Sequence, residues 1–150
     1  METQQDFKEL LALFNFHEVE FVIIGAHALA FHGVPRYTSD MDIYVRQDKE
    51  NAQRVLAALT DFGFGAVGLS EKDFLEPDKI IQLGYPPVRI DLLTSISGVS
   101  WEEVAAHWVV GEYGDIPVHY IGREQFIANK RACGRTKDLA DIEAIEECID

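Results

Sequence analysis

The segment Asp40-Met41-Asp42-Ile43 alternates acidic and apolar residues. Alternate side chains of a β-strand point to the same face, so Asp40 and Asp42 lie side by side while Met41 and Ile43 can pack on helices. At a rise of about 3.3 Å per residue, the Cα atoms of the two acids are roughly 6.6 Å apart, and both carboxylates reach one divalent cation or a pair of them. Without a cation, their repulsion raises a pKa. By itself the pattern also fits two solvated acids at a strand end.

Two further features favour an acidic site. Gly25-Ala26 follows a short apolar run and opens a helix, and the free backbone N–H groups of such a turn suit a phosphate. Further along, the segment around Asp91 alternates so that this carboxylate lies on the opposite face from Ile90 and Leu92. A phosphate-binding turn, two acids on one strand and a third on a later strand are the parts that two-metal phosphoryl or nucleotidyl transfer requires.

The rest of the chain alternates between helical and strand patterns. Phe7, Leu10, Leu11 and Phe14 recur at helical spacing and predict an amphipathic first helix over residues 4–17. The other predicted elements are strands over 21–24, 40–45, 79–83 and 88–93 with a turn at 85–87, a pair of short strands around 111–115, and helices over 26–31, 49–59, 123–132 and 137–149. This order predicts an α/β (α+β) fold, a small mixed β-sheet flanked by helices.

Length and composition point to one acidic domain. The 150 residues match one ordinary core, so residues 1–150 are expected to form a single domain. With 13 Lys+Arg against 26 Asp+Glu, the formal net charge of −13 repels extended nucleic acid and anionic membrane. No run approaches the roughly 20 apolar residues of a membrane span, and the first residues lack a signal-peptide pattern, which predicts a cytoplasmic protein. Cys133 and Cys148 are expected to be reduced thiols.

One family carries the same combination of residues. Gly25-Ala26, thirteen intervening residues, Asp40-x-Asp42 and then Asp91 resemble the Gly-Ser, DxD and third Asp of nucleotidyltransferases of the DNA polymerase β superfamily. The resemblance implies the nucleotidyltransferase fold, with the three aspartates as catalytic residues and as ligands of Mg²⁺ or Mn²⁺. It also implies that Gly25 and Ala26 bind the nucleotide. Ala26 stands where the family has serine, which removes one hydroxyl contact to the phosphates and leaves the backbone contacts.

The C-terminal third extends the resemblance over most of the chain. Lys130, Arg135, Lys137-Asp138 and Asp141 resemble the pattern of AbiEii-type nucleotidyltransferases, a group that includes toxins of bacterial toxin–antitoxin pairs. The resemblance implies that Lys130 contacts the nucleotide phosphates, with Arg135 and Lys137 as weaker contacts. Asp138 and Asp141 are expected to orient these cations or to cap the last helix. Residues 123–137 form a basic strip, and residues 138–150 form an acidic tail. The alternative for the whole basic strip is a solvated helix face that pairs with the acidic tail.

The segment around the strand of the two aspartates adds further candidate residues. Arg36 and Thr38 precede that strand, where the resembling family also has Arg and Thr. Arg36 either binds a phosphate as a planar fork or pairs with one of the many acids of the chain. Thr38 is expected to hold the segment through a backbone hydrogen bond. His27 and His32 lie five residues apart, off the spacing of a helical metal pair, and are interpreted as structural histidines with satisfied hydrogen bonds.

The leading functional prediction is a Mg²⁺-dependent nucleotidyltransferase that transfers a nucleoside monophosphate from a triphosphate such as ATP to an acceptor hydroxyl, with release of pyrophosphate. The acceptor is a small molecule, a protein hydroxyl or an RNA end, and Asp91 is a candidate to accept its proton. One alternative is a non-catalytic nucleotide-binding or partner-binding module, such as one component of a toxin–antitoxin pair. Another is a glycosyltransferase whose DxD binds a sugar nucleotide, for which a chain of this length leaves little room.

Overall fold

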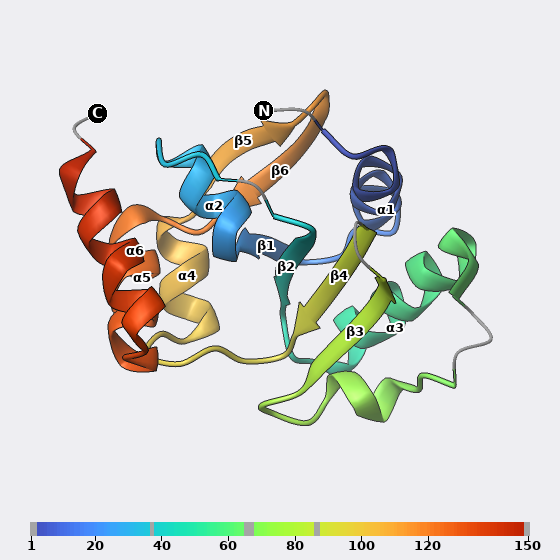
Figure 1. The fold of residues 1–150 in the computed structure, drawn as a ribbon. Helices are drawn as coiled ribbons and strands as arrows, with labels where there is room; N and C mark the ends of the chain where they lie inside the picture. Colours follow the sequence, from blue (N-terminus) through green and yellow to red (C-terminus); the bar gives the residue numbers. More distant parts are fainter. Residues whose placement is uncertain (1–2, 37, 65–67, 86–87, 149–150) are drawn as a thin grey trace.

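A mixed β-sheet of six strands organises the computed structural model, which describes residues 3–36, 38–64, 68–85 and 88–148 (Figure 1). The strands are β1 (Phe21–Ile24), β2 (Asp40–Val45), β3 (Ile80–Tyr85), β4 (Val88–Leu93), β5 (Val109–Tyr113) and β6 (Ile116–Tyr120). Their order across the sheet is β3-β4-β2-β1-β6-β5. Strand β2 runs parallel to β4 and antiparallel to β1, and β1 runs parallel to β6. The pairs β3–β4 and β5–β6 are antiparallel hairpins.

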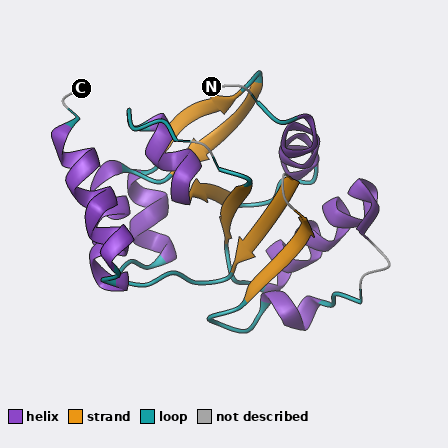
Figure 2. Ribbon diagram, viewed as in Figure 1, coloured by secondary structure: helices purple, strands orange, loops and turns teal. Residues whose placement is uncertain are grey.

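Five of the six α-helices form two groups at opposite ends of the molecule, and α2 lies between them beside the central strands β1 and β2 (Figure 2). The helices are α1 (Gln5–Phe16), α2 (Gly25–Phe31), α3 (Lys49–Leu59), α4 (Trp101–His107), α5 (Arg123–Cys133) and α6 (Thr136–Glu147). Helix α5 packs on α6 and α4 at one end, and α1 packs on α3 at the other. None of the helices in the described part of the chain is long and apolar enough to span a membrane.

The core lies under the apolar face of the central strands. Met41 and Ile43 of β2 and Leu92 of β4 are fully buried, together with Leu11 and Phe14 of α1. The alternation of the sequence therefore sends one set of side chains into the core and leaves the acidic set on the opposite face.

The predicted α/β fold with a mixed sheet flanked by helices is confirmed, with differences at particular elements. Helix α4 lies where no helix was predicted. Ser100 caps it by accepting a hydrogen bond from the backbone N–H of Glu103 at 3.2 Å, and Glu103 accepts one from the backbone N–H of Ser100 in return. Helix α6 begins at Thr136, one residue earlier than predicted. Of the turn predicted at residues 85–87, the two prolines lie outside the described residues, as does Ile149 at the predicted end of the last helix.

Candidate active site

Strands β2 and β4 place four charged side chains on one face of the sheet. Asp42 is the cross-strand partner of Asp91, and Asp40 is the partner of Arg89. Because residues two apart on a strand share a face, the four side chains form a two-by-two array. The register of the strands thus brings together the three acids predicted from the sequence and adds an arginine. We call these four side chains the charged array.

Asp42 lies in a partly buried position beside the two other carboxylates of the charged array. Burial raises its pKa to about 6, with further contributions from the carboxylates of Asp91 and Asp40, while the ammonium of Lys130 acts in the opposite direction. Arg89 donates to both oxygens of the buried Asp91, from Nε to Oδ1 and from Nη2 to Oδ2, each at 3.1 Å. The arginine of the array therefore compensates Asp91 and leaves Asp42 facing two carboxylates.

This raised pKa predicts that metal-free protein loses stability as the pH rises from mild acid to neutral. A carboxyl whose pKa is about 6 in the folded state and 3.8 when unfolded binds its proton more tightly in the folded state. The free energy of unfolding therefore falls as the pH rises through this interval, by about 3 kcal/mol in total for this one group. Urea unfolding of the wild type and Asp42→Asn in EDTA, from pH 4 to 7, measures the effect.

Asp42→Asn serves as the control for the wild type, because it lacks the titrating carboxyl and retains all other acids. Its stability relative to the wild type should increase between pH 4 and pH 6.5 and then level off. A difference between the two proteins that stays constant over this range would show that Asp42 titrates normally.

Gly25 brings the backbone at the start of α2 against the charged array. Its φ is +67°, in the left-handed region, and a Cβ at this position would lie 2.3 Å from Oδ2 of Asp42. Only glycine combines this conformation with such a close approach. The end of β1 and the carboxylate of Asp42 are therefore in direct contact.

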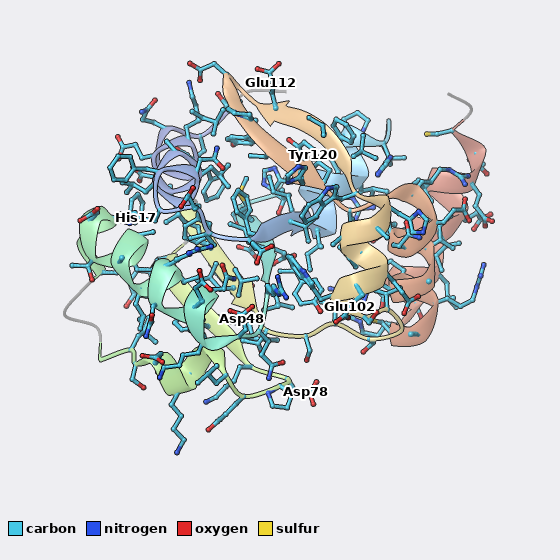
Figure 3. The ribbon with its side chains drawn as sticks, turned by 180° about the vertical axis from the view of Figure 1, so that it is seen from behind. His17, Asp48, Asp78, Glu102, Glu112 and Tyr120 are labelled. Carbon is cyan, nitrogen blue, oxygen red and sulfur yellow. The ribbon has the colours of Figure 1, made fainter. Side chains whose placement is uncertain are left out.

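A cavity of about 540 Å³ opens over the charged array. Strands β3 and β4 form one wall, α5 and the start of α6 form the other, and the segment from β4 to α4 runs between them (Figure 1). Asp78, in the loop before β3, lies at the rim (Figure 3). Of the predicted nucleotide-binding residues, Gly25, Lys130, Arg135 and Lys137 line this cavity, whereas Ala26, Arg36 and Thr38 are not among its lining residues.

Two buried acids of α6, Asp138 and Asp141, hold three cations beside the cavity. Lys130 Nζ lies 3.5 Å from Asp138 Oδ1 and 3.7 Å from Asp141 Oδ2. Arg135 donates to Asp138 from Nε at 2.7 Å and from Nη2 at 3.2 Å, which lowers the pKa of Asp138, and Arg36 forms an ion pair with Asp141. Three positive charges meet two negative ones, so this group carries a net positive charge, and Lys130 and Arg135 present it to the cavity. We call this group the cation cluster.

Polar contacts show the roles of several other residues that the sequence analysis discussed. Thr38 Oγ1 accepts from the backbone N–H of Asp40 and donates to its carbonyl oxygen, both at 3.1 Å, which is the backbone contact expected for it. Arg36 pairs with an acid, one of its two alternatives. His32 Nε2 donates to the carbonyl of Ile121 at 2.7 Å, as expected for a structural histidine. His27 is buried against Phe7 and Tyr113, as expected for a structural histidine, but its Nε2 has no hydrogen-bond partner among the described residues.

Arg89 and Asn129 line the cavity but were not predicted from the sequence. Arg89 lies two residues before Asp91 in a predicted strand, so the alternation that assigned a face to Asp91 also assigns that face to Arg89. Asn129 has no such signal. Its Nδ2 donates to the carbonyl of Ser97 at 2.9 Å and ties α5 to the segment between the two walls, a contact that only the tertiary structure shows.

Solved structures that superpose on the chain share one architecture. The lincosamide antibiotic adenylyltransferase LnuA with bound lincomycin has a TM-score of 0.57 at 16% identity, covering 97% of each chain. The antibiotic-resistance factor ANT(2'')-Ia has a TM-score of 0.58 at 13% identity, covering 94% of this chain and 80% of its own. TM1012 from Thermotoga maritima, a candidate nucleotidyltransferase, has a TM-score of 0.57 at 16% identity, covering 95% and 89%.

The chain has the nucleotidyltransferase fold. This confirms the fold implied by the sequence resemblance, and at identities of 13–16% the likeness is one of fold. The sequence matches no protein-family model and no curated protein. The AbiEii-type assignment stays a prediction.

Proposed function

We propose that the chain is a divalent-metal-dependent nucleotidyltransferase with ATP or another nucleoside triphosphate as donor. The observation that supports this proposal most directly is the position of the charged array, which lies at the base of a cavity opposite the cation cluster. A nucleoside triphosphate needs both chemistries, cations for its phosphates and carboxylates for the metal that accompanies them. Residues 1–150 act as one domain in this proposal.

The carboxylates of the charged array supply the oxygen ligands that a hard divalent cation prefers. Carboxylate oxygens are the preferred ligands of Mg²⁺ and Mn²⁺, and a cation would stabilise the charged form of Asp42, whose pKa is raised first by burial and then by the carboxylates of Asp91 and Asp40. Among the described residues, no three His, Cys, Asp or Glu side chains converge into a ready-made metal cluster. Both oxygens of the third acid, Asp91, are hydrogen-bonded to Arg89. Asp40, Asp42 and Asp91 would hold the metal once this pair opens.

The cation cluster holds the triphosphate in this proposal. Lys130 projects from α5 toward the charged array, and Arg135 and Lys137 line the same wall. Asp138 and Asp141 orient Lys130, whose ammonium lies between them. The acceptor oxygen attacks the α-phosphorus, a new P–O bond forms, the bond to the β-phosphate oxygen breaks, and pyrophosphate leaves. Asp91 accepts the proton of the acceptor hydroxyl. The bound metal supplies charge stabilisation for the phosphoryl oxygens.

A small hydroxylated molecule is the acceptor that the comparisons favour. Two of the superposed proteins are named for antibiotics, a lincosamide adenylyltransferase and an antibiotic-resistance factor. The net charge of −13 opposes a long nucleic acid. The alternative acceptors are a protein hydroxyl or an RNA end, including a partner in a toxin–antitoxin pair. The size of the labelled product distinguishes them from a small molecule.

The test is transfer of label from each α-labelled nucleoside triphosphate. The protein is incubated with Mg²⁺ or Mn²⁺ and a total cell extract, and the labelled product is separated into macromolecules and metabolites. We expect label in one product and stoichiometric release of pyrophosphate, both lost in the Asp40→Asn, Asp42→Asn double variant. Binding of the triphosphate without label transfer or pyrophosphate release would favour the non-catalytic nucleotide-binding module.

Lys130→Met should weaken triphosphate binding while leaving the fold in place. The substitution retains the side-chain stem over the Phe126 ring, from whose centroid Nζ lies 5.5 Å, and removes the charge. Loss of a charged hydrogen bond to phosphate costs about 1.5–3 kcal/mol, which is roughly a 10- to 150-fold increase in Kd. Calorimetric titration with a non-hydrolysable triphosphate measures it.

The matched control is Arg131→Met, which removes the adjacent positive charge of α5 from an exposed position outside the cavity. This control should bind the triphosphate like the wild type. Equal affinities for Lys130→Met and the wild type would remove Lys130 from the site and return the basic strip to a solvated helix face.

A further inference from the structure

Arg89 occupies one corner of the charged array. Its cross-strand partner on β2 is Asp40, and its partner on β3 is Gly84. The arginine side chain is 30% exposed and lines the cavity. The guanidinium thus lies beside three carboxylates and remains accessible from the cavity.

The contact between Arg89 and Asp91 engages both oxygens of the carboxylate. Two parallel N–H···O bonds of 3.1 Å engage both oxygens of Asp91 in a bidentate pair. The side chain of Asp91 is 11% exposed, so few other groups can reach these oxygens. A divalent cation that takes Asp91 as a ligand therefore competes with the guanidinium for these two oxygens.

We propose that Arg89 is a displaceable counter-ion, which neutralises Asp91 in the free protein and moves to the phosphates when a metal and a nucleoside triphosphate bind. This inference rests on the proposed function and adds a positioning residue to it. Carboxylate and phosphate offer the same bidentate geometry to a guanidinium. The released guanidinium of Arg89 therefore forms equivalent hydrogen bonds with a phosphate in the cavity. The exchange lowers the affinity for metal alone and couples metal binding to triphosphate binding.

A purely structural ion pair predicts different metal binding. In that case a cation binds at Asp40 and Asp42, Asp91 stays with Arg89, and the arginine acts on the metal only through its long-range field. The field would persist in a protein without the Asp91 charge, whereas competition for Asp91 would not. A double-mutant cycle separates the two.

The experiment titrates nucleotide-free protein with Mn²⁺ and detects free Mn²⁺ by electron paramagnetic resonance, so that it does not depend on catalytic activity. We expect Arg89→Met to bind Mn²⁺ about tenfold or more tightly than the wild type, and the gain to vanish when Asp91→Asn is combined with it. With Mn²⁺ saturating, Arg89→Met should bind a non-hydrolysable triphosphate about tenfold more weakly. Arg89→Gln, which retains a polar group, replaces Arg89→Met if circular dichroism shows that the latter is unfolded.

Arg46→Met is the matched control. Arg46 is also an ion-paired arginine, bonded to Glu20 and Asp48 at the far end of β2, outside the cavity. Its loss should leave Mn²⁺ affinity unchanged. Unchanged or weaker Mn²⁺ binding in Arg89→Met, an equal gain in the Asp91→Asn background, or no Mn²⁺ binding in any variant would overturn the counter-ion role. Failure of label transfer alone would contradict the proposed function without changing these binding results.

Discussion

Asp42→Asn and Asp40→Asn should each lower the rate of the proposed nucleotidyl transfer by about a thousandfold or more, and both variants should stay folded. Each substitution removes one negative charge from the charged array and changes almost no volume. The loss falls on the transferring step because an amide oxygen neutralises a cation poorly. Single-turnover transfer of label from an α-labelled triphosphate with saturating Mg²⁺ measures the effect.

The thermal stability of these variants distinguishes an acid that serves a binding site from an acid that stabilises the fold. Asp42→Asn should melt at a higher temperature than the wild type in EDTA at neutral pH, because it removes a partly buried charge whose pKa is raised by burial and by the neighbouring carboxylates. Asp115→Asn, in the exposed turn between β5 and β6, is the matched control and should retain the wild-type transfer rate. Transfer at wild-type rates in Asp42→Asn would contradict the assignment of the metal site.

Gly25→Ala should reduce transfer by about a hundredfold or more, since its Cβ would lie 2.3 Å from Oδ2 of Asp42 and would force that carboxylate out of position. The left-handed φ of +67° adds a backbone penalty of about 1–2 kcal/mol to the loss of stability. Transfer kinetics and thermal melting measure the two effects separately.

Gly68→Ala controls for the backbone penalty alone. Gly68 has a φ of +79°, and a Cβ there would meet no atom within 4 Å. We expect it to lose stability comparably and to retain its transfer rate. If Gly25→Ala were no less active than Gly68→Ala, then the contact between Gly25 and Asp42 would have no part in the reaction.

The distribution of residues between the two faces of β2 and β4 could be read from the sequence. A strand sends successive side chains to opposite faces for reasons of covalent geometry, so the facing of Asp40, Asp42 and Asp91 follows from their spacing. Burial of Met41 and Ile43 on the other side selects which face meets the core. The glycine at the start of α2 and the helical spacing of α1 are likewise local signals.

Only the tertiary structure decided which distant segments meet. The parallel pairing that sets Asp42 beside Asp91 joins strands separated by α3 and β3, and no local pattern specifies that register. The same holds for Arg36. The sequence left open whether it binds a phosphate or pairs with an acid, and in the structure it pairs with Asp141 of α6. Periodicity determines the direction of a side chain relative to its own backbone. Its partner is determined by how the apolar faces of the whole chain pack together, which is a property of all the elements at once.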